Sequence, residues 1–278
     1  MTSTWFRRFT TDAGRGPRLV CFPHAGGSAT AFKELAQQLP AGFDVLCVQY
    51  PGRQDRYHEE PFTAVAPLVE AVAGELAGEI AAAPGRPYAL FGHSMGALLA
   101  FETARVLARR GELPTPRRLF LSGRGGPATG RVPYHLFDDG DVLADVRRLG
   151  GTDQAMLDDP DLLELVLPAL RADYRALGTY VWEGGAPLAT PVTALTGDSD
   201  PMMSVEDAHT WQAHTSGDFA VQVFPGGHFY LFDQPAQVAA AITGDLLAAG
   251  ALTEPDGGSD AGATRTTARL DESTNEWA

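Results

Sequence analysis

One short stretch constrains the fold of this chain more than any other. Residues 90–98 read LFGHSMGAL, an apolar run followed by a G-x-S-x-G pattern and the beginning of a helical pattern. Where a strand turns sharply into a helix, the central serine has a crowded backbone, so the residues two before and two after it must be small. Gly92 and Gly96 meet this requirement around Ser94. A plain glycine-rich turn is the alternative interpretation, but the apolar patterns on both sides favour an exposed, reactive serine.

Strand-like and helix-like segments alternate on both sides of this turn. The predicted strands are residues 5–9, 18–22, 44–50, 88–91, 118–122, 192–197 and 219–224. Apolar residues at helical spacing lie between them, for example over residues 65–82, 95–110 and 235–249. Strands that alternate with helices form a parallel sheet with right-handed crossovers. The sequence therefore predicts an α/β fold, with a mostly parallel central sheet flanked by helices.

The alternation breaks between residues 125 and 187. Most of this region shows only a helical pattern, and a sheet cannot use so many consecutive helices. We therefore predict a core of residues 1–124 and 188–250, interrupted by residues 125–187. Because active sites lie at the carboxyl ends of parallel strands, this inserted region is interpreted as a helical lid over the Ser94 pocket. A small helical bundle added for stability is the alternative.

The positions of proline and the local composition predict how the insertion is divided into helices and where the core ends. Inside the insertion the pattern predicts short helices over residues 141–149, 154 or 155–157, 161–167 and 168–180, of which the last two meet at Pro168. Residues 251–278 are dominated by Gly, Ser, Thr and Asp and predict a disordered C-terminal tail.

Charge and composition exclude several classes of function. A formal net charge of −14 over 278 residues, without basic clusters, argues against nucleic-acid binding. No stretch resembles a signal peptide or a membrane span, and Cys21 and Cys47 lie in apolar runs rather than in a disulfide framework. We therefore expect a cytoplasmic protein. No group of His, Cys or carboxylate residues has metal-ligand spacing, so no metal site is expected.

A serine hydroxyl is a weak nucleophile unless a base takes its proton as it attacks. His228 is the best candidate, because it lies on a glycine-containing loop directly after a predicted strand. The carboxylate that orients its imidazole should come from the loop after the preceding strand, which holds Asp198 and Asp200. Asp198 could instead bind the N–H groups of its own turn, whereas Asp200 has more reach and is preferred. The chain order Ser, Asp, His is that of α/β-hydrolases.

The negative charge that develops on a substrate carbonyl oxygen needs two N–H donors. The backbone of Met95, the residue after the serine, should supply one of them. The second should come from the first strand-to-helix loop, where Ala25 is preferred and Gly26 is the alternative. His24 could orient this loop, and His93 is interpreted as a packing and hydrogen-bonding residue. The remaining histidines are expected at the surface.

Five short segments carry a likeness to a known family. They are FPHAGG from residue 22, YPGR from residue 50, GHSMG from residue 92, GDSD from residue 197 and GGHF from residue 226. Together they resemble the type II thioesterases of polyketide and nonribosomal peptide synthesis, and the likeness spans roughly residues 5–249.

The resemblance implies an α/β-hydrolase fold and an editing enzyme. Such enzymes hydrolyse stranded acyl groups from the phosphopantetheine arm of carrier proteins through an acyl-serine intermediate. By this likeness Ser94 is the nucleophile, His228 the base and Asp200 the acid, and the helical insertion is the lid. Acyl or peptidyl carrier proteins are the implied partners, no cofactor is required, and a monomer is expected. A small-molecule esterase or lactonase, or an acyltransferase, of the same fold is the alternative.

Carrier proteins are usually acidic, so a partner with a charge of −14 must offer local basic residues. The candidates are Arg15, Arg18, Arg53, Arg56 and Arg86, although the sequence shows no clear patch.

Overall fold

A seven-stranded sheet forms the centre of the protein, whose computed structural model describes residues 3–9, 16–111, 113–129, 132–150 and 157–251. The strands are β1 (Phe6–Arg8), β2 (Arg18–Phe22), β3 (Asp44–Val48), β4 (Tyr88–His93), β5 (Leu119–Ser122), β6 (Val192–Gly197) and β7 (Phe219–Phe224). Their order across the sheet is β1-β3-β2-β4-β5-β6-β7, and only the β1–β3 pair is antiparallel. The predicted mostly parallel sheet is confirmed.

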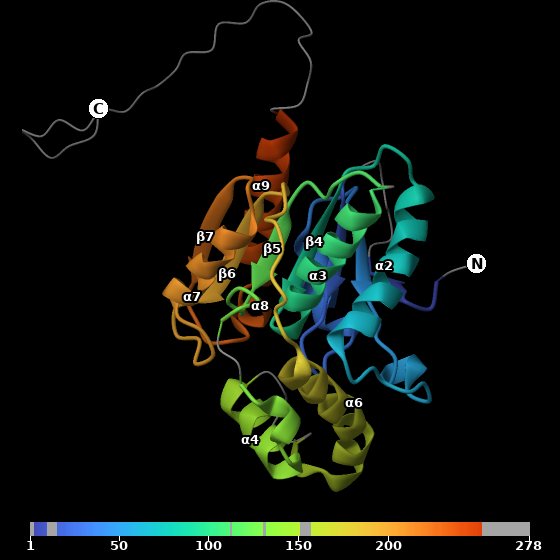
Figure 1. Cartoon of the computed structure of the whole chain (residues 1–278), viewed down its shortest axis with the longest axis vertical. Helices are drawn as coiled ribbons and strands as arrows, with labels where there is room; N and C mark the ends of the chain where they lie inside the picture. Colours follow the sequence, from blue (N-terminus) through green and yellow to red (C-terminus); the bar gives the residue numbers. More distant parts are fainter. Residues whose placement is uncertain (1–2, 10–15, 112, 130–131, 151–156, 252–278) are drawn as a thin grey trace, which may run out of the picture.

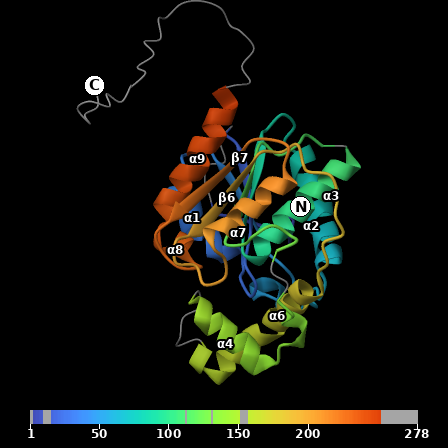
Figure 2. The same cartoon turned by 60° about the vertical axis from the view of Figure 1, so that its left-hand side comes forward.

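Helices cover both faces of this sheet. The α-helices are α1 (Lys33–Gln38), α2 (Val65–Ala81), α3 (Met95–Arg110), α4 (Asp139–Leu149), α6 (Pro160–Thr179), α7 (Val205–His209), α8 (Tyr230–Asp233) and α9 (Pro235–Ala251). Short 3-10 helices are η1 (Ala29–Phe32), η2 (Gln54–Arg56), η3 (Tyr134–Leu136) and η4 (Thr210–His214). Figures 1 and 2 show α2, α3 and α7 on one face, with α1, α8 and α9 on the other.

Each face of the sheet has its own apolar core. Val20 and Phe22 of β2 pack in the cluster with α2 and α3, whereas Leu19 and Cys21 pack in the cluster with α1 and α9. Successive side chains of a strand point to opposite faces, so a strand covered on both sides is buried at every position. This explains why the central strands read as unbroken apolar runs. Cys47 is also buried, and both cysteines are unbonded.

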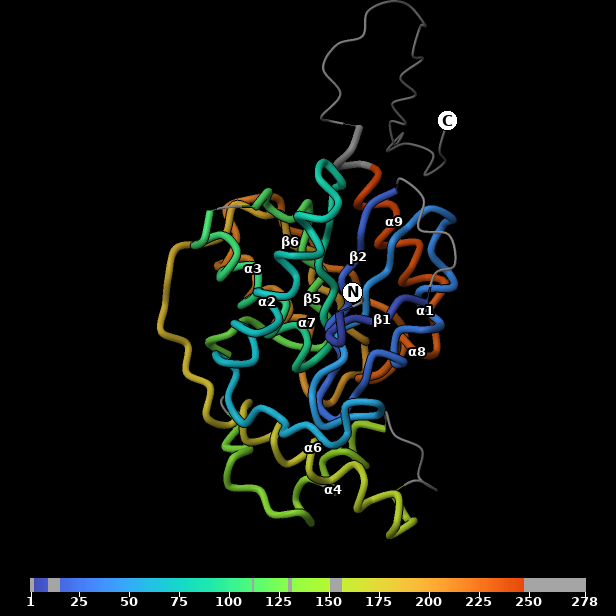
Figure 3. The backbone as a smooth tube through the Cα atoms, turned by 90° about the vertical axis from the view of Figure 1, so that its right-hand side faces the viewer, coloured from blue at the N-terminus to red at the C-terminus, as the bar shows by residue number. Residues whose placement is uncertain are grey.

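The remaining helices, η3, α4 and α6, form a separate layer beyond one end of the sheet, which we call the helical block (Figures 1 and 3). It has a small core of its own, formed by Val142, Val146, Leu157, Leu170 and Tyr174. The helix α4 begins with a reciprocal cap, in which the side chains of Asp138 and Asp141 each accept the other's backbone N–H.

Helix α6 is continuous, so the predicted break at Pro168 is wrong. The carboxylate of Asp159 caps its first turn, and the helix runs through Pro168 to Thr179. An internal proline removes one hydrogen bond and clashes with the preceding turn. Here Val166 and Leu170, on either side of the proline, pack against the same cluster, and this shared burial keeps the two halves aligned.

The predicted C-terminal boundary is also displaced slightly. Helix α9 extends to Ala251, one residue beyond the predicted end of the core at residue 250. The rest of the predicted tail, residues 252–278, lies outside the described residues.

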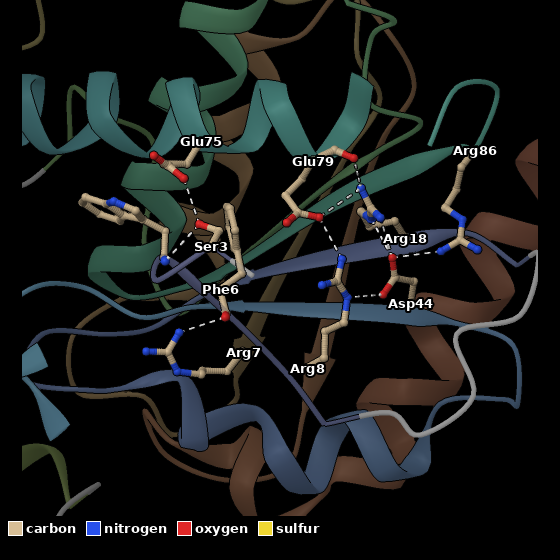
Figure 4. Close-up of polar contacts among 10 residues, drawn as sticks. Ser3, Phe6, Arg7, Arg8, Arg18, Asp44, Glu75, Glu79 and Arg86 are labelled. Atoms are coloured by element: carbon tan, nitrogen blue, oxygen red, sulfur yellow. Dashed lines mark hydrogen bonds and ion pairs between the residues drawn. The ribbon is translucent and has the colours of Figure 1, made fainter. Parts of the chain in front are cut away.

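Three arginines bind one buried carboxylate at the end of the sheet where β2 and β3 begin. Figure 4 shows Asp44, only 1% exposed, surrounded by three guanidinium groups. Arg18, Arg8 and Arg86 donate to its carboxylate at 2.8, 3.1 and 2.9 Å. Burial alone would raise the pKa of Asp44, but the hydrogen bonds and charges of Arg18 and Arg8 outweigh it and hold the pKa below its ordinary value.

The arginines expected to form a basic docking surface do not form one among the described residues. Arg18, Arg53 and Arg56 are all buried in the described structure, so they cannot form an exposed patch. Arg86 is committed to Asp44, and Arg15 lies outside the described residues.

We predict that Asp44→Asn lowers the free energy of unfolding by about 3–5 kcal/mol at neutral pH, because it leaves the buried guanidinium group of Arg18 without its carboxylate. The loss should shrink in acid. A carboxyl group whose pKa is lowered by folding stabilises the fold at pH values above its unfolded-state pKa of about 3.9. This contribution disappears as the pH falls through its folded-state pKa. Urea denaturation of both proteins from pH 7 to pH 3 measures the difference.

The control is Asp139→Asn, which removes the exposed partner of Arg171 and should have a much smaller effect. An equal loss for both variants would contradict the importance of the buried cluster.

Candidate active site

Ser94 lies at the junction of β4 and α3, in a backbone conformation that side chains rarely adopt. Its φ and ψ are 56° and −115°, and such a conformation costs about 1–3 kcal/mol in a residue other than glycine. A Cβ atom at Gly92 would lie 2.1 Å from the carbonyl oxygen of Gly96, and one at Gly96 would lie 1.9 Å from that of Phe22. A side chain at either position would force β4, α3 and β2 apart, so both must be glycine.

The loop after β7 brings His228 to the loop after β6. Nδ1 of His228 lies 2.8 Å from Oδ2 of Asp200, and the two side chains are 1% and 0% exposed. The N–H of Met202 donates to Oδ1 of the same carboxylate at 2.8 Å, which fixes its orientation. The two loops approach so closely that a Cβ at Gly197 would lie 2.3 Å from the carbonyl oxygen of Gly226.

Asp198 binds the neighbouring loop rather than the N–H groups of its own turn, which was the alternative predicted for it. Its Oδ1 accepts the N–H of Gly226 at 3.0 Å and the hydroxyl of Ser199 at 2.8 Å. These hydrogen bonds, with that of Gly226 the stronger cause, lower the pKa of this exposed carboxyl. Asp198 therefore ties the two loops together, while Asp200 meets His228.

Ser94 and His228 line the same cavity, which has a volume of about 180 Å³. Nε2 of His228 is buried and has no hydrogen-bond partner among the described residues. Three residues of the helical block line the cavity: Val146 of α4, and Tyr174 and Leu177 of α6. The site is thus a partly apolar pocket between the carboxyl end of the sheet and the helical block.

Two backbone N–H groups predicted to bind the oxyanion have no hydrogen-bond acceptor among the described residues. Met95 is the first residue of α3, and its N–H has no acceptor among the described residues; the same holds for Ala25. The N–H of Gly26 is different, because it donates to Oδ2 of Asp173 at 2.7 Å. Of the two residues that the sequence left open for the second donor, Ala25 therefore keeps an unbonded N–H and Gly26 does not.

Two more histidines surround the site, and burial keeps both neutral. Burial, reinforced by the charges of His228 and Arg53, lowers the pKa of His24 from 6.5 to about 3. Burial likewise lowers the pKa of His93 far below its ordinary value. Nδ1 of His93 lies 2.8 Å from the Ser122 hydroxyl, so His93 packs and forms a hydrogen bond as expected.

Other residues near the site were missed or misplaced by sequence reasoning. Asp173 lies at helical spacing from the apolar residues Leu170 and Leu177, and an acid in a buried stripe was the available signal. Arg124 lines the cavity, its Nε is buried without a partner among the described residues, and burial lowers its pKa. His214 is half-buried rather than exposed. The centre of its ring lies 5.1 Å from that of Trp182, and the two rings are perpendicular.

Comparison with known proteins assigns the family. The thioesterase domain family matches residues 17–246. The chain belongs to this family. It is a hydrolase of the serine α/β-hydrolase type, and the resemblance to type II thioesterases of polyketide and nonribosomal peptide synthesis is confirmed.

Three similar proteins illustrate this relationship. The thioesterase PikA5 of Streptomyces venezuelae is 46% identical over 245 residues, which cover 87% of this chain and 85% of PikA5. The solved structure of BorB, a type II thioesterase from the borrelidin biosynthetic cluster, is 40% identical with a TM-score of 0.79, covering 88% of this chain and 99% of BorB. YbtT, a type II thioesterase of the yersiniabactin pathway, is 30% identical with a TM-score of 0.78 and the same coverage.

No helix in the described part of the chain has the length and apolar character needed to cross a membrane. Over the same residues, no three His, Cys, Asp or Glu side chains are grouped in a way that could hold a metal ion.

We predict that Ser94→Gly is more stable to urea than Ser94→Ala by about 1 kcal/mol. Glycine adopts a positive φ without strain, and its larger unfolded-state entropy offsets only ~0.5–1 kcal/mol of the relief. Ala97→Gly, in the regular part of α3, serves as the control and should be destabilising. Equal or greater stability of Ser94→Ala would mean that the turn is not strained.

Proposed function

We propose that this protein is an editing thioesterase, which hydrolyses stranded acyl groups from the phosphopantetheine arm of carrier proteins in polyketide or nonribosomal peptide synthesis. The observation that carries the proposal is the Asp200–His228 pair, with a free Nε2, in a cavity that also exposes Ser94. The three side chains come from loops after β6, β7 and β4, which meet at the carboxyl end of the sheet.

The acylation step uses these groups in order. Asp200 accepts the Nδ1–H of His228 and so keeps the lone pair on Nε2, which takes the proton of the Ser94 hydroxyl. The Ser94 oxygen bonds to the thioester carbonyl carbon, and collapse of the tetrahedral intermediate breaks the C–S bond. The thiolate of the phosphopantetheine arm leaves and recovers a proton from His228, which regenerates the free thiol of the carrier.

The carbonyl oxygen becomes an oxyanion in this step, and we assign its two donors to the N–H groups of Met95 and Ala25. The bond from Gly26 to Asp173 supports Ala25 over Gly26, because a donor already held by a carboxylate is unavailable to the substrate. The bond from the Gly27 N–H to the His24 carbonyl, at 2.9 Å, supports the same choice. In a trans peptide the His24 carbonyl and the Ala25 N–H point in opposite directions, so the N–H is directed away from the turn.

Hydrolysis of the acyl-serine completes the cycle. His228 removes a proton from water, the hydroxide oxygen bonds to the acyl carbon, and the Ser94 oxygen leaves with the proton held by His228. The carboxylic acid departs and the enzyme returns to its starting state. Side chains, backbone amides and water supply every group in this cycle, so the proposal includes no cofactor.

The helical block acts in this proposal as the lid, within the inserted region of residues 125–187. Val146 and Tyr174 line the cavity from this block, so its packing would limit the length of acyl chain that fits. The proposed partners are acyl or peptidyl carrier proteins, met by a cytoplasmic monomer. The likeness to BorB, from the borrelidin biosynthetic cluster, and to YbtT, from the NRPS/PKS pathway of yersiniabactin, supports this class of pathway.

A hydrolysis profile tests the function. The substrates are acyl groups of graded length, presented as thioesters on a phosphopantetheinylated carrier protein, as thioesters of N-acetylcysteamine, and as p-nitrophenyl esters. We expect kcat/KM to be highest for the carrier-bound thioesters. Efficient hydrolysis of the esters with none of the thioesters would favour an esterase, and acyl transfer to added alcohols or amines would favour an acyltransferase.

We predict that Asp200→Asn lowers kcat by roughly 10⁴-fold, because the amide no longer selects the required tautomer of His228. The matched control is Asp198→Asn, two residues away on the same loop, which should cost far less because Asp198 binds a loop N–H and a hydroxyl. The reverse ranking of the two aspartates would exchange their roles.

Ser94→Ala should abolish turnover and labelling by a fluorophosphonate while the protein stays folded.

A further inference from the structure

One buried carboxylate, that of Asp173, joins the helical block to the loop that carries Ala25. Oδ2 of Asp173, on α6, accepts the N–H of Gly26 at 2.7 Å and also binds Nη2 of Arg53. Asp173 is 2% exposed, and Arg53 is 6% exposed. This contact joins a helix beyond the sheet to the loop after β2, which are 147 residues apart in the chain.

Arg53 completes the connection from the other side. Its Nε donates to the carbonyl of Gly27 at 3.1 Å and its Nη1 to the carbonyl of Pro51 at 2.8 Å. The guanidinium also lies 5.0 Å from the centre of the Tyr50 ring, and the Tyr50 hydroxyl donates to the carbonyl of Pro23 at 3.2 Å. The loop is thus bound at two carbonyls from the end of β3 and at one N–H from α6.

Shape reinforces this attachment. Gly26 has a φ of 73°, and a Cβ there would lie only 2.5 Å from Cδ2 of Leu170. Leu170 and Asp173 are three residues apart and so lie on one face of α6. One helix face therefore packs on the loop with an apolar side chain and binds it with a charged one.

We propose that Asp173, held by Arg53, is a positioning residue that fixes the oxyanion-binding loop when α6 lies on it. The Gly26 N–H, anchored on the carboxylate, sets the plane of the peptide between Ala25 and Gly26 and thereby the direction of the neighbouring Ala25 N–H. The positive charge of Arg53 offsets the negative charge of the Asp173 carboxylate. Without Arg53, that negative charge would oppose an oxyanion forming nearby. If the lid lifts, the loop loses this anchor, so hydrolysis is coupled to closure of the helical block.

This inference rests on the proposed function, because it assumes that Ala25 donates to the oxyanion. Asp173→Ala should lower kcat by about 10²-fold, the usual consequence of losing or displacing one oxyanion donor. KM should change little, since the ground-state thioester does not depend on that donor. Asp173→Asn should lose less, because its amide oxygen can still accept the N–H of Gly26 although the ion pair with Arg53 is lost.

The decisive measurement compares two inhibitors in the wild type and in both variants. A trifluoromethyl ketone analogue of the acyl thioester forms a hemiketal oxyanion with Ser94, and its inhibition constant should rise in parallel with the fall in kcat/KM. A thioether analogue without a carbonyl should bind all three proteins equally. Equal loss for both inhibitors, or unchanged kcat in Asp173→Ala, would overturn the proposal.

Two controls separate positioning from stability. Arg171→Gln, on the same helix, removes the exposed ion pair with Asp139 and should leave kcat unchanged. Val142→Ala weakens the buried core of the helical block without touching the loop, and at equal loss of thermal stability it should retain more kcat than Asp173→Ala. Similar kcat losses in Val142→Ala would assign the effect to folding of the block.

Thioester hydrolysis and Ser94 labelling by the wild type distinguish failure of the proposed function from failure of the positioning role. If it neither hydrolyses thioesters nor is labelled at Ser94, the proposed function fails. If it does both and Asp173→Ala retains full kcat, only the positioning role fails.

Discussion

The close approach of three backbones around Ser94 is the constraint on which the rest of the structure depends. The strand β4 passes into α3 without space for a Cβ at Gly92 or Gly96, and the latter lies directly against the carbonyl of Phe22 in β2. This packing holds a serine at positive φ and aligns the end of β2 with the start of α3. The glycines therefore let the start of α3 and the end of β2, where the loop that carries Ala25 begins, meet beside one serine.

Burial on all sides gives the site its electrostatic character. His24 and His93 stay neutral because burial disfavours their charged forms, so neither competes with His228 as a cation beside Asp200. The Asp200 carboxylate is fully buried and bonded at both oxygens, which limits its motion. The result is one imidazole with a fixed orientation and one free nitrogen.

Two ion-pair clusters around buried carboxylates have different consequences. Asp44 and its arginines lie at the end of the sheet where β2 and β3 begin, where they hold β1, β2 and β3 together far from the chemistry (Figure 4). Asp173 and Arg53 lie at the carboxyl ends and join the helical block to the loop after β2. The same type of interaction therefore serves the sheet in one place and the site in the other.

Local pattern and chain order determined much of this protein. Glycine spacing predicts the turn at Ser94, unbroken apolar runs predict a parallel sheet covered on both faces, and the order of loops after parallel strands predicts that Ser94, Asp200 and His228 share one edge. These features depend on residues close in sequence or on a general rule of topology. The tertiary structure alone decided whether α6 passes through Pro168, which loop Asp198 binds, and which arginines are buried. It also revealed Asp173, whose partners are 147 and 120 residues away in the chain, because contacts between distant segments follow from packing and leave no local pattern.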